Sequence, residues 1–224
     1  MLKSLKLKLI ESGKLKTSIV LFLLSVYCFA LTIARATYTG SDLFLFLNWN
    51  LFLAFIPWLI TTALIINPNL RNNMFLFLGI MVLWIAFFPN APYILTDLFH
   101  IKWSTAAPIW FDTAMILTFA WTALCFGFLS LMDIDNILTQ KLNSFLSKFI
   151  ITVLLFAAGF GVYIGRYLRW NSWDLVNEPS GIIYDIGERV LFPLAHPGTW
   201  GMTLLMGLLL NMMFWTIKFS FQNR

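Results

Sequence analysis

The sequence predicts an all-α membrane protein, a polytopic bundle of six transmembrane helices. Of its 224 residues, 60% are hydrophobic and only 11% are charged, and the mean hydropathy is +0.82. A soluble domain carries about 25% charged residues, so a chain this apolar lacks the polar side chains that would cover a surface in water. The apolar residues also form runs of the length that crosses a bilayer, about 20 residues. We therefore expect one integral membrane domain over residues 1–224, surrounded by lipid.

The six expected spans are roughly 17–36, 43–66, 73–89, 107–131, 146–168 and 200–218. The third run is short and ends at Pro89. Because the residue before a proline is pushed out of helical geometry, we expect the helix to break there, at the outer end of the span. In the second span, Asn48 and Asn50 are expected to bond neighbouring helices or to line a polar cavity. In the fifth, Ala157, Gly161 and Gly165 share a face that allows close helix packing.

The distribution of basic residues predicts that both termini lie on the inner side of the membrane. The inner side then holds Lys3, Lys6, Lys8, Lys14, Lys16, Arg71, Lys141, Lys148, Lys218 and Arg224, and the outer side holds Arg35, Lys102, Arg166, Arg169 and Arg189. The positive-inside rule favours this arrangement. The loops over 89–106 and 167–199 should therefore face outward. The net charge of +5 is explained by lysines near lipid headgroups, and no basic patch with base-stacking aromatics indicates a nucleic-acid partner.

The first apolar run also resembles a signal peptide, because lysines precede it and Ala34-Arg35-Ala36 follows its core. Its length of about 17 residues exceeds the usual apolar region of 7–15 residues. We expect an uncleaved first helix. Cleavage would leave five spans and would not change the side that the loops face.

Two polar segments at the predicted outer face carry the candidate site. In the first, Phe88 to His100, Asp97 and His100 are three residues apart and share a face if the segment is helical. In the second, arginines and polar residues follow the fifth span. We expect one site with Asp97 and His100 as candidate catalytic residues. The candidate ligand-binding residues are Asn90, Tyr93, Arg166, Arg169, Asn171 and Asp174.

Several functions remain open for this site. Ionisable groups at membrane depth are functional candidates, but Asp97 or Asp112 could equally form a structural ion pair with Arg166. Arg166 and Arg169 could bind an anionic headgroup or another lipid-like ligand, as in a binding or accessory protein. Alternatively, Asp97 and His100 could perform acid/base chemistry on a lipid-linked substrate.

A metal site and a transporter are further alternatives. Zinc or manganese could bind a set drawn from His100, Asp97, Asp112, Asp174 and His196, although no tight ligand spacing favours it. A transporter would use the break at Pro89, but we expect that break at the outer end of the span, and the chain has no evident internal duplication. The identity of any metal or cofactor is left open, as is the question of whether the protein is an enzyme.

The loop over 167–199 is too long for a simple connection. A helix that begins near Pro179 would place Ile182, Ile183, Ile186 and Val190 on one face, as in a short helix that lies in the membrane interface. Tryptophans at the same level would form an interfacial aromatic belt; they are Trp103, Trp110, Trp170, Trp173 and Trp200.

Two phrases of the chain resemble one known family. The first is Phe88-Pro89-Asn90-Ala91-Pro92-Tyr93 with Thr96-Asp97-Leu98 and His100, and the second runs from Gly165-Arg166-Tyr167 to Trp173-Asp174. Both are similar to the bacterial membrane-protein family called domain of unknown function thirteen sixty-one, roughly from the third span to the sixth. The resemblance implies a multi-pass protein of the bacterial cytoplasmic (inner) membrane. It implies no activity and no catalytic roles.

Overall fold

The computed structural model describes residues 2–103 and 106–222, and over these ranges the protein is helical without any β-strand. Six helices in the described ranges are long and apolar enough to cross a membrane: Leu15–Thr39, Phe46–Ile66, Met74–Ile101, Ile109–Thr139, Ser144–Tyr167 and Pro197–Ser220. The predicted fold class and the number of spans are confirmed, although the third span reaches Ile101 instead of ending at Pro89. Arg224, which entered the orientation argument, lies outside the described residues, and the direction of insertion stays a prediction.

The chain divides into two compact units, Met1–Asp133 and Ile134–Arg224, which we describe separately. The first unit contains α1 (Leu2–Glu11), α2 (Leu15–Thr39), α3 (Phe46–Ile66), α4 (Asn69–Asn72), α5 (Met74–Phe87), α6 (Asn90–Tyr93), the 3-10 segment η1 (Ile94–Trp103) and most of α7 (Ile109–Thr139). The second contains the end of α7, α8 (Ser144–Tyr167), α9 (Asp174–Asn177), α10 (Pro179–Leu191), η2 (Pro193–Ala195) and α11 (Pro197–Gln222). That residues 1–224 form one integral domain stays a prediction.

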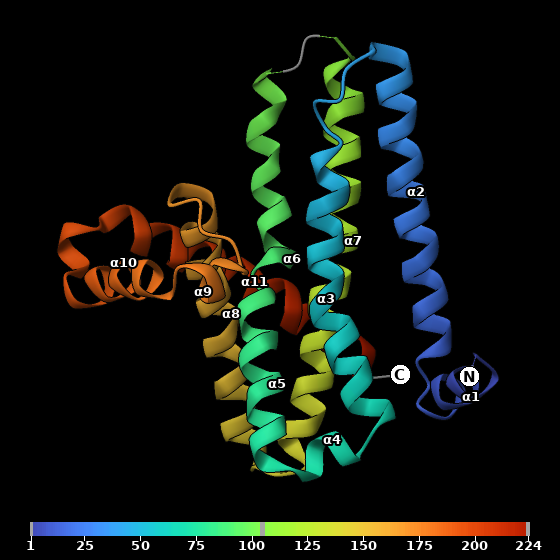
Figure 1. Cartoon of the computed structure of the whole chain (residues 1–224), viewed down its shortest axis with the longest axis vertical. Helices are drawn as coiled ribbons and strands as arrows, with labels where there is room; N and C mark the ends of the chain where they lie inside the picture. Colours follow the sequence, from blue (N-terminus) through green and yellow to red (C-terminus); the bar gives the residue numbers. More distant parts are fainter. Residues whose placement is uncertain (1, 104–105, 223–224) are drawn as a thin grey trace. The chain divides into compact units, whose positions relative to one another are not determined.

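In the first unit, α2, α3, the α5–η1 segment and α7 run side by side (Figure 1). The core lies between α3 and α7, where Leu47 and Leu51 share a buried cluster with Ile116 and Phe119. Other large apolar side chains of these helices point outward; Phe75, for example, is 89% exposed. Such an outer surface is unfavourable in water and suits lipid, where a helix satisfies its own backbone polar groups.

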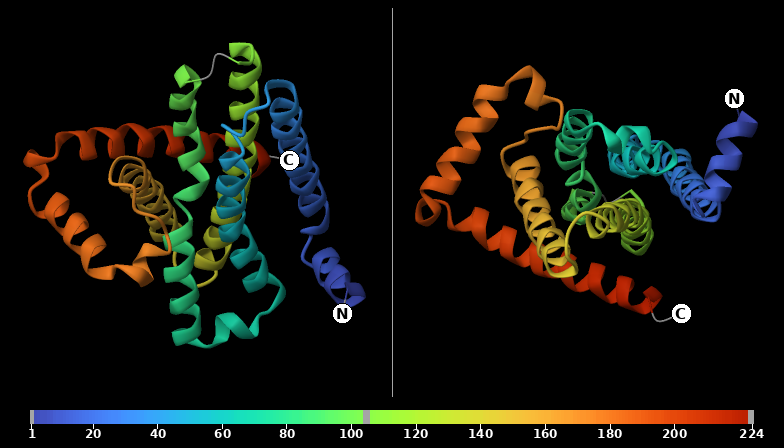
Figure 2. Two further views of the ribbon diagram at one scale, coloured as in Figure 1. Left: turned by 45° about the horizontal axis from the view of Figure 1, so that its top comes forward. Right: turned by 90° about the horizontal axis from the view of Figure 1, so that it is seen from below.

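The third span continues past its two prolines. Pro89 and Pro92 lack the N–H that an α-helix needs, so α5 ends at Phe87, and the chain continues through α6 and η1 (Figure 2, left). The side chain of Asn90 donates a hydrogen bond to the Phe87 carbonyl at 2.8 Å. Gly127 of α7 lets the segment pack closely, because a Cβ there would lie 2.7 Å from Ala91 Cβ. The break at the prolines is as predicted, but the span ends at Ile101, so the break lies near its middle and not at its outer end.

In the second unit, α8 and α11 pack through glycines. A Cβ on Gly159 would lie 2.9 Å from the Thr203 carbonyl oxygen, and one on Gly207 would collide with the Phe156 ring. The predicted face is therefore wrong at Ala157, which is exposed. The four-residue spacing identified a face of small residues on α8. The face that meets α11 is a different one, which includes Gly159. The short helix expected near Pro179 is present as α10.

Candidate functional site

Polar side chains from four elements of the first unit gather at one end of its spans. We call this set the polar layer: Thr32, Arg35, Asn48, Asn50, Asp97, His100 and Asp112. The end of α2, the start of α3, the end of η1 and the start of α7 meet there because consecutive spans run in opposite directions. Several members bond each other; the side-chain amide of Asn48, for example, donates to Thr32 Oγ1 at 3.1 Å.

Asp97 is the most deeply buried member of the polar layer. The residue is 0% exposed, and its Oδ2 accepts a hydrogen bond from the amide of Asn50 at 2.9 Å. His100 Nδ1 lies 3.7 Å from Asp97 Oδ1 and 3.2 Å from the Asp97 backbone carbonyl. The 3-10 helix of η1 brings the two side chains together, because residues at i and i+3 eclipse in that geometry. The expectation that Asp97 and His100 share a face is met, while a catalytic role for them stays a prediction.

Arg35 and Asp112 form a buried ion pair. Arg35 Nε lies 2.7 Å from Asp112 Oδ1, Nη2 lies 3.3 Å from Oδ2, and both side chains are 2% exposed. Two parallel N–H···O bonds of this kind fix the relative position of both groups. Asp112 thus pairs with Arg35, which the sequence analysis counted among the outer basic residues and in a possible cleavage site but did not include in the candidate site.

Aromatic rings connect this ion pair to Asp97 and His100. The Arg35 guanidinium lies 4.4 Å from the centre of the Phe44 ring, a cation–π distance. Phe44 and Phe46 have ring centres 6.1 Å apart, and Phe46 lies 5.2 Å from the His100 ring. The Phe44 and Phe46 rings thus link the Arg35 guanidinium to the His100 ring by a series of contacts.

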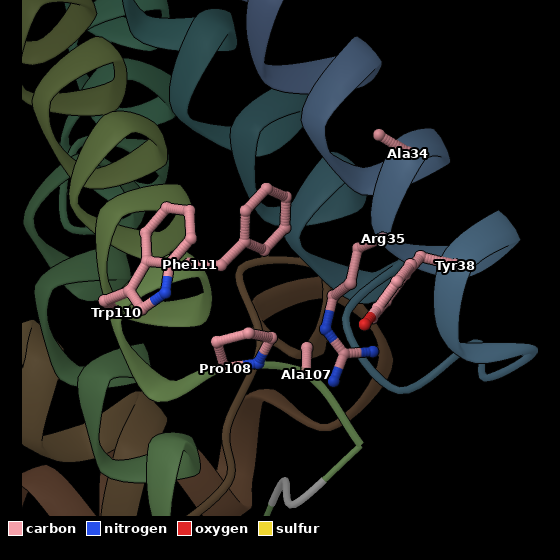
Figure 3. A pocket seen from close by; sticks show the side chains of 7 residues that line it. All are labelled: Ala34, Arg35, Tyr38, Ala107, Pro108, Trp110 and Phe111. Atoms are coloured by element: carbon pink, nitrogen blue, oxygen red, sulfur yellow. The ribbon is translucent and has the colours of Figure 1, made fainter.

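A pocket of about 380 Å³ opens beside the ion pair. We call it the Arg35 pocket; its lining residues are Ala34, Arg35, Tyr38, Ala107, Pro108, Trp110 and Phe111. Arg35 and Tyr38 project from the end of α2 toward Ala107 and Pro108 before α7 (Figure 3). Its volume falls in the range of small-molecule sites, about 300–1,000 Å³. The combination of one guanidinium with apolar and aromatic walls suits a ligand that has a polar head and an apolar body.

The first predicted segment also holds Asn90 and Tyr93, and both take part in the local helix structure. Asn90 bonds the Phe87 carbonyl, and the carbonyl of Tyr93 accepts a 2.6 Å hydrogen bond from Thr96 Oγ1. Neither residue lines the Arg35 pocket. Ligand contacts of Asn90 and Tyr93 stay a prediction.

The second predicted segment lies in the second unit. Arg169 follows the C-cap of α8 with φ +63°, and the N–H of Trp170 bonds the carbonyl of Ile164. A left-handed residue just after the C-cap is usually a glycine. Asp174 Oδ2 accepts hydrogen bonds from the backbone and side chain of Asn171. Arg166, at the last turn of α8, is half-buried. Their assembly with Asp97 and His100 into one site stays a prediction, because the two segments belong to separate units.

Carboxylates near the other end of α7 were missed by the sequence analysis. Asp133 pairs with Lys14 and accepts a hydrogen bond from Thr61 at 2.7 Å. In the second unit, Asp135 pairs with Lys218 and accepts from Ser147. The sequence did contain a signal for these contacts. Asp133 and Asp135 lie in an apolar span, where a buried carboxylate requires a partner.

Metal binding finds no ready site in the described part of the chain. No group of three or more His, Cys, Asp and Glu side chains lies close enough there to hold a metal ion. Of the five proposed ligands, Asp97, His100 and Asp112 belong to the first unit, and Asp174 and His196 to the second.

Comparison with known proteins identifies one relationship. No curated protein and no solved structure matches the chain. The family model described as "Protein of unknown function (DUF1361)" matches residues 49–213, which include Asp97, His100, Asp112 and the end of α8. The chain therefore belongs to this family of multi-pass membrane proteins of unknown function.

Proposed function

We propose that the protein binds an anionic, lipid-like amphiphile in the Arg35 pocket. The observation that supports this most strongly is the position of Arg35, a 2%-exposed arginine that lines a pocket otherwise walled by apolar and aromatic side chains. The arginine would hold the head of the ligand by charge-assisted hydrogen bonds. Its apolar part would lie along Pro108 and Phe111.

The surroundings of the pocket favour a ligand that comes from the membrane. Tyr38 and Trp110, at its edge, are 75% and 71% exposed. They lie at the ends of two spanning helices, where amphipathic rings sit at headgroup level. A lipid could therefore enter sideways without crossing water. We place this activity in the bacterial cytoplasmic membrane with both termini inside, as the basic residues predict, and we keep Arg166 and Arg169 as a second proposed anion contact.

The test compares lipid binding by neutral double variants. Arg35→Leu with Asp112→Leu removes the ion pair without changing the net charge, and native mass spectrometry measures binding of phosphatidylglycerol and phosphatidylcholine. A charge-assisted hydrogen bond contributes about 1.5–3 kcal/mol, so we expect the preference for phosphatidylglycerol to fall by about tenfold or more. The matched control is Lys14→Leu with Asp133→Leu, which removes another ion pair of the same unit. An equal effect of both double variants, or of neither, would contradict the proposal.

A second candidate function is a membrane-embedded enzyme. The observation that favours it is the 3.7 Å distance between His100 Nδ1 and Asp97 Oδ1. This distance exceeds a direct hydrogen bond, but acid/base partners can act through one water or move closer when a substrate binds. The substrate would be lipid-linked. His100→Gln should then change the lipid composition of cells that express it, relative to the wild type at equal protein level, whereas a binding protein predicts unchanged lipid chemistry.

The broken third span also bears on a transporter. Transporters build substrate sites where helices are interrupted near the middle of the membrane, and Pro89 lies near the middle of the Met74–Ile101 span. However, Asn90 satisfies the Phe87 carbonyl, and Ala91 packs against Gly127. The break therefore supports a packing role better than a transport site.

A further inference from the structure

In the second unit, α10 and η2 expose several large apolar side chains, while one charged residue of α10, Arg189, is buried. The exposed side chains include Leu194 at 95%, Leu191 at 72% and Ile183 at 69%. We call this surface the α10–η2 face; its members are Ile183, Tyr184, Val190, Leu191, Phe192 and Leu194. Arg189 of the same helix is only 8% exposed. A helix that faces water exposes its charges and buries its apolar residues, so large exposed apolar side chains beside a buried arginine are unusual for such a helix.

The charged side chains of α10 lie near partners within the unit. Glu188, whose side chain is 40% exposed, lies 3.8 Å from Arg189 Nη1 and 3.6 Å from His196 Nε2. Asp185 Oδ1 lies 3.1 Å from Arg189 Nη1, and its Oδ2 accepts a 2.6 Å hydrogen bond from the indole of Trp170. The indole of Trp200 donates to the Arg189 carbonyl at 3.1 Å. Gly181 permits this packing, because a Cβ there would lie 2.7 Å from the Trp170 ring. The tryptophans and the ion pair thus turn the polar side of α10 toward the protein.

The α10–η2 face is followed directly in the chain by a spanning helix. The span of α11 begins at Pro197, three residues after Leu194, so Leu194 cannot lie far from the depth at which α11 enters the membrane. On α11 itself, Leu205 is 66% exposed. Exposed apolar side chains are therefore found both on η2 and on the spanning helix that follows it.

We propose that the α10–η2 face is immersed in the acyl chains of the membrane. On this proposal, α10 is a lipid-embedded helix and not a surface helix with its charges in water. Lipid accounts for both features together: it favours exposed leucine and isoleucine, and it requires each charged group to be paired inside the protein. The sequence pattern predicted a helix in the membrane interface. Because Arg189 is buried and paired, we place this helix deeper, among the acyl chains.

Spin-label accessibility tests the proposal in the full chain. Single cysteines replace Ile183, Leu194, Glu178 or Leu205 in a Cys28→Ala, Cys125→Ala background, and the labelled proteins are placed in phosphatidylcholine nanodiscs. Collision rates are measured with oxygen, which dissolves in acyl chains, and with a water-soluble nickel chelate. Glu178, an exposed charged residue before α10, is the water standard, and Leu205 is the lipid standard.

We expect labels at 183 and 194 to resemble the label at 205. Because a polar chelate is excluded from acyl chains, their ratio of oxygen to nickel collisions should exceed that at 178 by about tenfold. A ratio equal to that at 178 would place the face in water and overturn the proposal. Low collision rates with both reagents would also overturn it, because they would show that protein covers the face, either the first unit or a second copy of the chain.

Discussion

Breaking the Arg35–Asp112 ion pair should strongly destabilise the first unit. Both side chains are 2% exposed, and two hydrogen bonds of 2.7 Å and 3.3 Å join them. Removal of one partner from a buried pair leaves an uncompensated charge and costs about 3–5 kcal/mol. We therefore expect Arg35→Leu and Asp112→Leu each to lower the free energy of unfolding by about this amount. The double variant leaves no buried charge and should be destabilised by less than about 1.5 kcal/mol, as for other replacements of similar shape.

The assay is equilibrium unfolding in mixed micelles of increasing denaturing detergent, followed by tryptophan fluorescence. The four proteins of the double-mutant cycle are compared under one condition, so that the coupling between the two positions is measured directly. Additive effects, with the double variant as unstable as the sum of the single variants, would refute the reasoning. Such a result would mean that each side chain is solvated independently and that the coupling free energy between them is close to zero.

Three further predictions concern the second unit. Gly207→Ala should destabilise the protein by about 1–3 kcal/mol, because the new Cβ collides with the Phe156 ring on the neighbouring helix. The control Gly201→Ala, on the same helix but with open space around it, should leave stability unchanged. Equal melting midpoints of the two variants in a thermal-shift assay would contradict this prediction. Arg169→Gly should raise the unfolding free energy by about 1 kcal/mol in a detergent titration, because it relieves a positive φ, and a loss of stability would show that the arginine side chain holds the unit together. Lys218→Met should lower the unfolding free energy by about 3 kcal/mol, because it leaves the buried Asp135 without its partner. Adding Asp135→Leu should restore the unfolding free energy. If the double variant stays as unstable as Lys218→Met, the Lys218–Asp135 pair is not what stabilises α11.

The spans were predictable because they depend on local sequence. A stretch of about 20 apolar residues crosses the membrane whatever its neighbours are, and all six helices follow from that rule. The exception is the end of the third span. Pro89 predicts a break, but continuation to Ile101 depends on Asn90 at the Phe87 carbonyl and on Gly127 of another helix. Those contacts are tertiary, so the local rule placed the end too early.

The polar layer was only half predictable for a similar reason. Asp97 and His100 lie three residues apart, and their contact follows from helix geometry. Asn50 was expected to find a partner, but its partner, Asp97, is 47 residues away in the sequence. Arg35 and Asp112 are 77 residues apart. In the prediction of orientation, Arg35 was counted as one of the outer basic residues, and the carboxylate that it would meet was not considered. Complementary charges near the same end of two spans were the available signal for this pair.

The first family phrase, from Phe88 to His100, and the Arg35 pocket lie in different parts of the first unit. The matched region begins at residue 49, so Asp112 lies within it, whereas Arg35 and Tyr38 precede it. Within the phrase, Asn90 and Thr96 bond backbone carbonyls, which indicates that much of this motif shapes the broken helix that carries Asp97. A buried Asp112 still requires a positive partner, and α2 supplies it. The first span, α2, therefore contributes to the Arg35 pocket. Removal of residues 1–36, as signal cleavage would do, should destabilise α7 and abolish lipid binding in this pocket.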